Sequence, residues 1–254
     1  MSGQEQKRKW LVANWKMHKT VGECDQFVRE LVKIPSSVLA NYQILLAPQF
    51  PFIKGVMDQL LESKIGICVA AQNCSDEKQG AYTGEVSPVA LSSLGCKYVL
   101  LGHLERRKLF GETSVLVAKK ARCAVEAGMI PIICLGEQHM QKDQVLHEID
   151  EQLLPVLDML NGLNIDEKIL WAYEPGWAIG AHEAAALPQI RQAHLHIKEC
   201  VRKQGFKMPT VLYGGAVTFE NSKQFLDDSS VDGLLLGRAS LTVSSFLRII
   251  GFEV

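Results

Sequence analysis

The sequence predicts a closed (β/α)₈ barrel that forms a single domain. Eight short apolar runs recur along the 254 residues, each is followed by a helical pattern, and no composition shift or long linker divides the chain. α/β barrels commonly reach this length as one domain, whereas the alternative, an open doubly wound sheet, does not normally need eight units. We therefore expect one barrel over residues 10–254, preceded by a polar N-terminal extension over residues 1–9.

The expected strands are short and rich in branched and aromatic residues, which is typical of parallel strands buried on both faces. They occupy residues 10–13, 43–47, 66–71, 98–101, 130–134, 169–173, 210–213 and 233–236. Apolar residues at helical spacing predict helices over residues 22–33, 115–126, 143–160, 187–203 and 244–250. Gly128 follows the second of these helices as a stop signal.

Composition and charge exclude several classes of protein. An apolar fraction of 47% and a charged fraction of 22% are ordinary for a globular protein, and a net charge of −1 argues against nucleic-acid binding. No apolar run approaches the ~20 residues that span a bilayer, and the polar N-terminus predicts no signal peptide. The seven cysteines are scattered and odd in number, which favours reduced thiols in a cytoplasmic protein over disulfides. No dinucleotide or P-loop motif follows a strand.

Glu174 stands where the expected strand 169–173 ends. Pro175 has no backbone N–H and so ends the strand. Gly176 and Gly180 bracket an apolar tip over residues 177–179, a composition that suits a hinged lid over a pocket. Taken alone, a Glu-Pro dipeptide favours a solvated glutamate in an ordinary strand-to-helix loop, and the rest of the chain reverses that preference.

Polar residues or glycines follow most of the other strands. They are Asn14, Lys16, Gln72, Asn73, His103, Glu105, Gly214, Gly215 and Gly237, with Tyr213 as the last residue of its strand. Each has a structural explanation by itself: Asn14 as a turn residue, Lys16 as a solvated charge, His103 as a core histidine. Because reactive groups of barrels collect at the carboxyl ends of the strands, the whole set predicts an active site there.

Eight motifs at these positions resemble the triosephosphate isomerase family. They are NWKM at 14–17, AAQN at 70–73, GAYTGE at 80–85, LGH at 101–103, ERR at 105–107, FGE at 110–112, AYEP at 172–175 and YGG at 213–215. They run in that family's order over nearly the full chain. The resemblance implies a TIM barrel, a homodimer and the interconversion of glyceraldehyde 3-phosphate and dihydroxyacetone phosphate through an enediolate, in glycolysis and gluconeogenesis.

The resemblance also implies roles for four catalytic residues. Glu174 would be the general base, with its basicity raised by loss of solvent under the lid. His103 would polarise the carbonyl as a neutral imidazole, because a helix N-terminus lowers its pKa. Lys16 and Asn14 would stabilise the developing oxyanion. No metal or organic cofactor is expected, and His194 and His196 lie two apart on a helix and do not share a face.

A second set would bind phosphate or support the site. Gly180, Gly214, Gly215 and Gly237 would offer backbone N–H groups to the phosphate, with Ala216 and Arg238 beside them. Glu105 would hold Lys16, and Tyr213 would support the site from behind. Thr83, on the loop 73–85, would reach the neighbouring subunit of the dimer, close to the partner subunit's Asn14 and the partner subunit's Glu105.

The chain departs from the family's pattern at several positions. Leu104 stands where the family usually has a serine, whose hydroxyl holds the general base while the lid is open. Without that hydroxyl, the sequence does not fix the resting position of Glu174. Gly176 replaces a branched residue, Ala216 a phosphate-contacting serine, and Arg238 a glycine beside the phosphate. Ala181, His182 and Glu183 replace a small hinge that ends in lysine.

These departures are either neutral drift or signs of a different substrate. Arg238 is the best indication of a change, since a guanidinium could add a bidentate phosphate contact or crowd the site. The alternative function is therefore a related aldose-ketose isomerase for a four-carbon ketose phosphate such as erythrulose phosphate. A catalytically silent barrel kept for binding is disfavoured, because Lys16, His103 and Glu174 are all present. The matching catalytic residues favour the triose phosphate.

Overall fold

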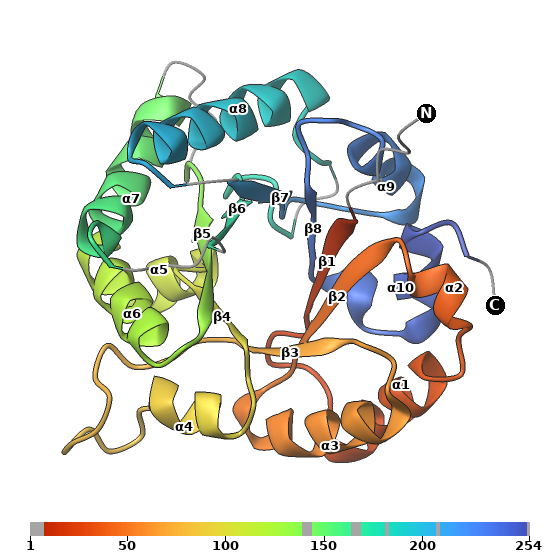
Figure 1. The fold of residues 1–254 in the computed structure, drawn as a ribbon. Coiled ribbons are helices and arrows are strands. Elements are labelled where there is room, and N and C mark those ends of the chain that lie inside the picture. The colour runs from red at the N-terminus through yellow and green to blue at the C-terminus, as the bar shows by residue number, and fades with distance from the viewer. Residues whose placement is uncertain (1–7, 139–143, 164–168, 181–182, 207–208, 253–254) are drawn as a thin grey trace, which may run out of the picture.

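The computed structural model describes residues 8–138, 144–163, 169–180, 183–206 and 209–252. Within these residues eight parallel strands close into a barrel, and β8 pairs back to β1 (Figure 1). The strands are β1 (Lys9–Asn14), β2 (Tyr42–Ala47), β3 (Cys68–Ala71), β4 (Tyr98–Leu101), β5 (Ile130–Leu135), β6 (Leu170–Tyr173), β7 (Thr210–Tyr213) and β8 (Gly233–Leu236). The predicted fold class is confirmed.

Helices form a ring outside the barrel (Figure 1). They are α1 (Val21–Leu31), α2 (Ser36–Leu39), α3 (Ile53–Ser63), α4 (Pro88–Ser93), α5 (Leu104–Phe110), α6 (Ser114–Glu126), α7 (Val145–Leu160), α8 (Leu187–Lys203), α9 (Phe219–Leu226) and α10 (Val243–Ile249), with 3₁₀ turns η1 (Phe50–Phe52) and η2 (Arg238–Ser240). The five helices for which the sequence predicted residue ranges are all present, as α1, α6, α7, α8 and α10. In the described part of the chain, no helix is long and apolar enough to cross a membrane.

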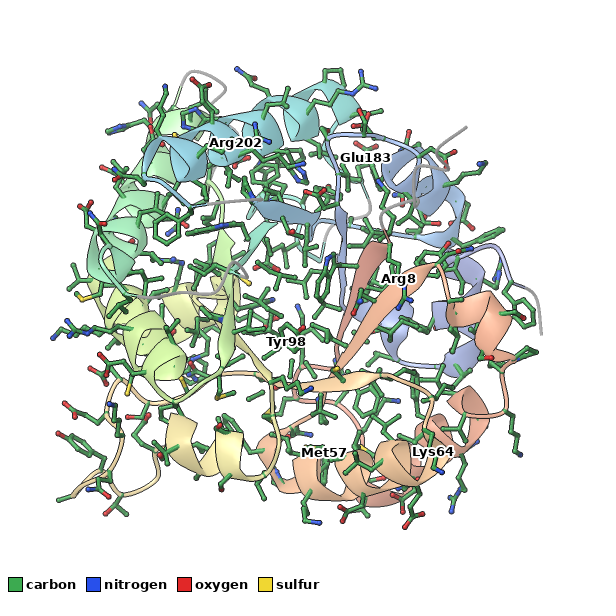
Figure 2. The ribbon with its side chains drawn as sticks, viewed as in Figure 1. Arg8, Met57, Lys64, Tyr98, Glu183 and Arg202 are labelled. Atoms are coloured by element: carbon green, nitrogen blue, oxygen red, sulfur yellow. The ribbon has the colours of Figure 1, made fainter. Side chains whose placement is uncertain are left out.

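Alternation along the strands divides the core into two layers. Val12, Leu100 and Ile132 belong to a cluster inside the barrel, whereas Leu11 and Ala13 belong to the layer between barrel and helices. At the amino ends of the strands, the rings of Trp10 and Tyr98 meet edge-on with centroids 5.8 Å apart. Tyr98 lies near the middle of the barrel in Figure 2. This aromatic pair lies at the amino end of the barrel, away from the carboxyl ends of the strands.

The first strand begins one residue before the expected start of the barrel, at Lys9. The Nζ atom of Lys9 donates to the carbonyl oxygens of Asp228 at 2.9 Å and Val231 at 2.5 Å. These bonds fasten the start of β1 beside the strand that closes the barrel. Residues 1–7 of the expected extension lie outside the described residues.

Candidate active site

A cavity of about 680 Å³ opens at the carboxyl ends of the strands. The predicted residues that line it are Asn14, Lys16, His103, Glu105, Glu174, Gly180, Gly214, Gly215, Ala216, Gly237 and Arg238. Tyr213 lies fully buried, one residue before Gly214 at the end of β7, and Thr83 is exposed on the loop between β3 and α4. The fold therefore brings most of the predicted residues to one place.

Glu174 follows β6 and lies almost completely buried, with 3% of the residue exposed. Its Oε1 atom is 3.3 Å from His103 Nε2, and its buried Oε2 atom has no hydrogen-bond partner among the described residues. Gly214 makes room for this position, because a Cβ atom there would lie 2.8 Å from Glu174 Cγ. A buried carboxylate oxygen without a hydrogen-bond partner lowers the stability of the fold, but it is available to accept a proton.

The pKa of Glu174 is lowered in this arrangement. Burial raises the pKa. The neighbouring His103, Lys16 and Cys134 thiol lower the pKa by more than burial raises it, so the net shift is downward. The expected rise of the pKa through desolvation is therefore outweighed by the charges and hydrogen bonds around the carboxylate. Glu174 is ionised at neutral pH, as a general base must be.

His103 caps the N-terminus of α5. Its Nδ1 atom accepts a hydrogen bond from the backbone N–H of Glu105 at 3.2 Å. Burial lowers the pKa of His103, but the nearby Glu174 carboxylate makes the net shift upward, so the expected lowering is not found. The hydrogen bond acts the other way and favours the neutral form, because an accepting Nδ1 carries no proton and leaves the proton on Nε2, toward Glu174.

Lys16 has a left-handed backbone, with φ 51°, an uncommon conformation for a residue with a side chain. The Asn14 Oδ1 atom accepts from the Lys16 backbone N–H at 3.0 Å, and Gln72 Nε2 donates to the Lys16 carbonyl at 2.8 Å. These bonds hold the strained turn that points the lysine into the cavity. The Lys16 Nζ atom lies 2.6 Å from Glu105 Oε1, so Glu105 holds the lysine as the resemblance implied.

Glycines and Arg238 form another part of the cavity lining. An Arg238 Nη2 atom donates to the Gly180 carbonyl at 3.4 Å, which connects the loop 176–180 to the turn after β8. The backbone N–H of Gly214 donates to the Tyr173 carbonyl at 2.9 Å. The resemblance implied that the Gly214 N–H binds phosphate. In the structure this donor instead extends the pairing of β6 with β7. The role of Gly214 is to leave space for Glu174.

Two buried residues at the end of β5 were not predicted. Glu137 accepts hydrogen bonds from the Tyr173 hydroxyl at 3.1 Å and from Trp177 Nε1 at 2.8 Å, so it fastens the start of the lid. Cys134 places its thiol beside Glu174. Glu137 was recognisable as a polar residue just past a strand end, whereas Cys134 looked like any other apolar strand residue.

A family model described as Triosephosphate isomerase matches residues 9–253. The chain belongs to the triosephosphate isomerase family. A triosephosphate isomerase of Syntrophotalea carbinolica is 38% identical over 253 residues, covering 97% of this chain and 99% of its own. One of Dictyoglomus turgidum is 40% identical over 255 residues, covering 96% and 99%. One of Aquifex aeolicus is 36% identical over 250 residues, covering 96% and 98%.

Two departures from the pattern of the triosephosphate isomerase family meet in space. A Cβ atom on Gly176 would lie 2.9 Å from the Glu137 carbonyl oxygen and 3.2 Å from Leu104 Cδ1. The Gly176 N–H donates to that same carbonyl at 2.7 Å, which fixes the close approach. Leu104 thus occupies space that a branched residue at 176 would need. Glu174 rests against His103, in a position that no serine hydroxyl is required to hold.

Two of the other departures from the family pattern are at the cavity. Ala216 and Arg238 line the cavity, and Arg238 is exposed. Glu183 is also exposed, whereas Ala181 and His182 lie outside the described residues. Arg238 therefore lies on the solvent side of the cavity.

Gly176→Ala should lower the free energy of unfolding by about 1–3 kcal/mol, because the new methyl group must displace a backbone carbonyl. Urea denaturation followed by circular dichroism measures this. Gly55→Ala is the matched control, since a Cβ at that position in α3 meets no atom within 4 Å. The control should be neutral or stabilising. Equal stability of Gly176→Ala and the wild type would contradict the proposed close approach.

Proposed function

We propose that this chain is a triosephosphate isomerase, which interconverts glyceraldehyde 3-phosphate and dihydroxyacetone phosphate in glycolysis and gluconeogenesis. The observation that carries the proposal is the meeting of Glu174, His103 and Lys16 around one cavity, with Glu174 Oε1 3.3 Å from His103 Nε2. A base, a neutral hydrogen-bond donor and a cation in one buried site are the groups that proton transfer beside a carbonyl requires.

In the proposed mechanism, Glu174 removes the proton from the carbon next to the carbonyl. The acceptor is its Oε2 atom, which is buried without a hydrogen-bond partner among the described residues. His103 donates from Nε2 to the substrate oxygen, and the charge of Lys16 stabilises the enediolate. Glu174 then returns the proton to the neighbouring carbon. In the same exchange His103 gives its Nε2 proton to the former carbonyl oxygen and takes up the proton of the neighbouring hydroxyl, so that the carbonyl has moved by one carbon and both residues are restored.

The phosphate would bind at the glycine-lined end of the cavity. The N–H groups of Gly180, Gly215 and Gly237 are the candidate donors, with Ala216 beside them. Arg238 supplies a positive charge at the same end. The proposed reaction needs no metal and no organic cofactor. The cysteines are free thiols throughout the described chain, which fits the reducing cytoplasm in which we place the protein.

An isomerase assay with glyceraldehyde 3-phosphate, run beside assays with erythrulose phosphates, tests this proposal. We expect turnover of the triose phosphate to exceed that of the four-carbon substrates. Activity on erythrulose phosphates alone would instead support the four-carbon isomerase. Activity on neither, from a folded protein, would support a barrel that only binds.

The second part of the proposal is a homodimer. The loop 73–85 protrudes from the barrel between β3 and α4 (Figure 1), and Thr83 is exposed on it. Two large apolar residues are also exposed, Tyr82 at 48% on the same loop and Met17 at 86% beside Lys16. A protruding loop and an exposed methionine next to the cavity suit an interface in which Thr83 approaches the partner subunit's site.

Sedimentation equilibrium at micromolar concentration should give twice the 28.2 kDa mass of the chain. Tyr82→Asp should shift this equilibrium toward the monomer, because it places a charge in a contact that must be desolvated. Leu195→Asp, at an exposed position on α8, serves as the control. A wild-type monomer with full activity at this concentration would rule the dimer out.

A further inference from the structure

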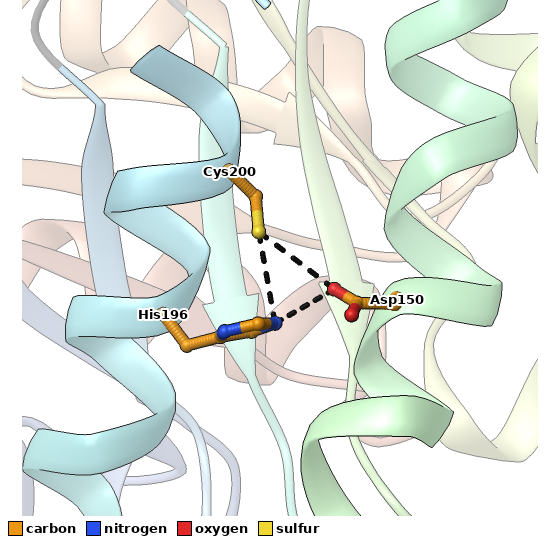
Figure 3. Close-up of side chains that lie close together, drawn as sticks. All are labelled: Asp150, His196 and Cys200. Atoms are coloured by element: carbon orange, nitrogen blue, oxygen red, sulfur yellow. Dashed lines mark hydrogen bonds and ion pairs between the residues drawn. The ribbon is translucent and has the colours of Figure 1, made fainter. Parts of the chain in front are cut away.

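Three side chains with metal-binding atoms meet between α7 and α8, on the outside of the barrel (Figure 3). His196 and Cys200 lie four residues apart on α8, so they share one face of the helix. Asp150 extends from α7 to meet them. The His196 Nε2 atom lies 2.7 Å from Asp150 Oδ1 and 3.6 Å from Cys200 Sγ, and the Sγ atom lies 3.8 Å from Asp150 Oδ1.

These separations are close to those within a tetrahedral metal site. Zn²⁺ with bonds of about 2.0–2.3 Å to oxygen, nitrogen and sulfur holds its ligand atoms about 3.3–3.6 Å apart. Both distances to the Cys200 sulfur already agree with this within a few tenths of an ångström. The contact of His196 with Asp150, at 2.7 Å, is a hydrogen bond that must widen by about 0.6 Å to admit the ion.

We propose that Asp150, His196 and Cys200 form a binding site for Zn²⁺ that joins α7 to α8. All three residues are half-buried, so the ion can enter from solvent, and a water molecule supplies the fourth ligand. Carboxylate, imidazole and thiolate are all donors that Zn²⁺ accepts. In the part of the chain that the structure describes, no other three such residues converge in this way.

Binding changes the protonation of two ligands. Burial and the Asp150 carboxylate raise the pKa of the Cys200 thiol, so the thiol keeps its proton in the metal-free protein. It releases that proton to solvent when sulfur binds the ion. The imidazole of His196 donates from Nε2 to Asp150 before binding, and moves that proton to Nδ1 so that Nε2 can coordinate the metal.

A catalytic Cys-His-Asp triad does not fit this cluster. In a triad, the carboxylate holds one nitrogen of the imidazole while the other nitrogen faces the thiol. Here both Asp150 and Cys200 face the same atom, Nε2 of His196. One nitrogen cannot orient the ring and activate the thiol at once, whereas convergence of three donors on one point is what a metal ion requires.

Titration of the reduced full-length protein with Zn²⁺, by calorimetry, tests the site. We expect one equivalent to bind, with a melting temperature several degrees higher when zinc is in excess of the dissociation constant. Cys200→Ser, His196→Gln and Asp150→Asn should each weaken binding at least about tenfold. Titration with Co²⁺ should give the absorbance of a cobalt-thiolate bond in the wild type and lose it in Cys200→Ser.

Two control variants separate this site from other histidines and thiols. His147→Gln removes an exposed histidine of α7 that pairs with Glu151, and Cys68→Ser removes a half-buried thiol of β3. Both should bind Zn²⁺ as the wild type does. Absence of zinc binding by the folded protein would overturn the proposal. Binding that survives the three ligand variants, or that is lost in the controls, would also overturn it. His196→Gln keeps the test decisive if Cys200→Ser does not fold.

Discussion

Lys16→Ala should lower kcat/KM by at least about 100-fold, because a buried contact with a developing oxyanion or a phosphate contributes roughly 3 kcal/mol or more to transition-state stabilisation. The side chain is 25% exposed and is directed into the cavity by the strained backbone of Lys16 itself, which the Asn14 side chain holds. Both turnover and substrate affinity should fall, since the lysine charge acts on the bound dianion and on the enediolate.

The barrel should remain folded in Lys16→Ala. The partner of the lysine, Glu105, is 43% exposed, so water can solvate its carboxylate after the substitution. Lys54→Ala is the matched control: it removes a lysine of α3 that is 62% exposed and paired with Asp58. Kinetics of the Lys16 variant that match those of the control would show that Lys16 is only a solvated charge.

Glu174→Asp should lower kcat by about 100-fold while KM changes much less. The shorter side chain keeps its charge but withdraws the carboxylate by about one methylene, and a misplacement of about 1 Å is enough for this loss. The groups proposed to hold the phosphate are untouched. Steady-state kinetics, with a carbon-bound deuterium to show that proton transfer limits the rate, provide the measurement.

Thermal stability should hardly change in Glu174→Asp, because the residue lies at the mouth of the barrel and one of its oxygens has no partner to lose among the described residues. Glu199→Asp, at an exposed position of α8, is the control and should be silent in both assays. Equal turnover of wild type and Glu174→Asp, with proton transfer rate-limiting, would remove Glu174 as the base.

The sequence predicted the barrel because each strand is a self-contained apolar run with a polar or glycine boundary. Its errors were local. The expected strand 66–71 begins only at Cys68, because Gly66 has φ 74° and turns the chain although Ile67 still packs against the core. Apolar character shows that a residue is buried, but it does not show the backbone angle at which it is buried.

The candidate site was predictable where one residue type at a strand end suffices, as for Glu174 and His103. The role of a site residue was not predictable where it depends on which hydrogen-bond partners the fold supplies. The Gly214 N–H donates to the Tyr173 carbonyl, and the bond from the Glu105 N–H is what favours a neutral His103. Asp150 and His196 are 46 positions apart, and only the packing of α7 on α8 brings them together. No spacing rule within a single helix could have found that pair.

The aromatic residues at the amino end of the barrel have a consequence for changing this protein's substrate. Trp10 and Tyr98 lie at the ends of strands opposite to those that bear Glu174 and Arg238. This aromatic packing is therefore spatially separate from the side chains that would choose a substrate. Directed evolution at Ala216 and Arg238 should thus sample many variants that still fold, and the barrel offers a robust starting point for new sugar-phosphate specificities.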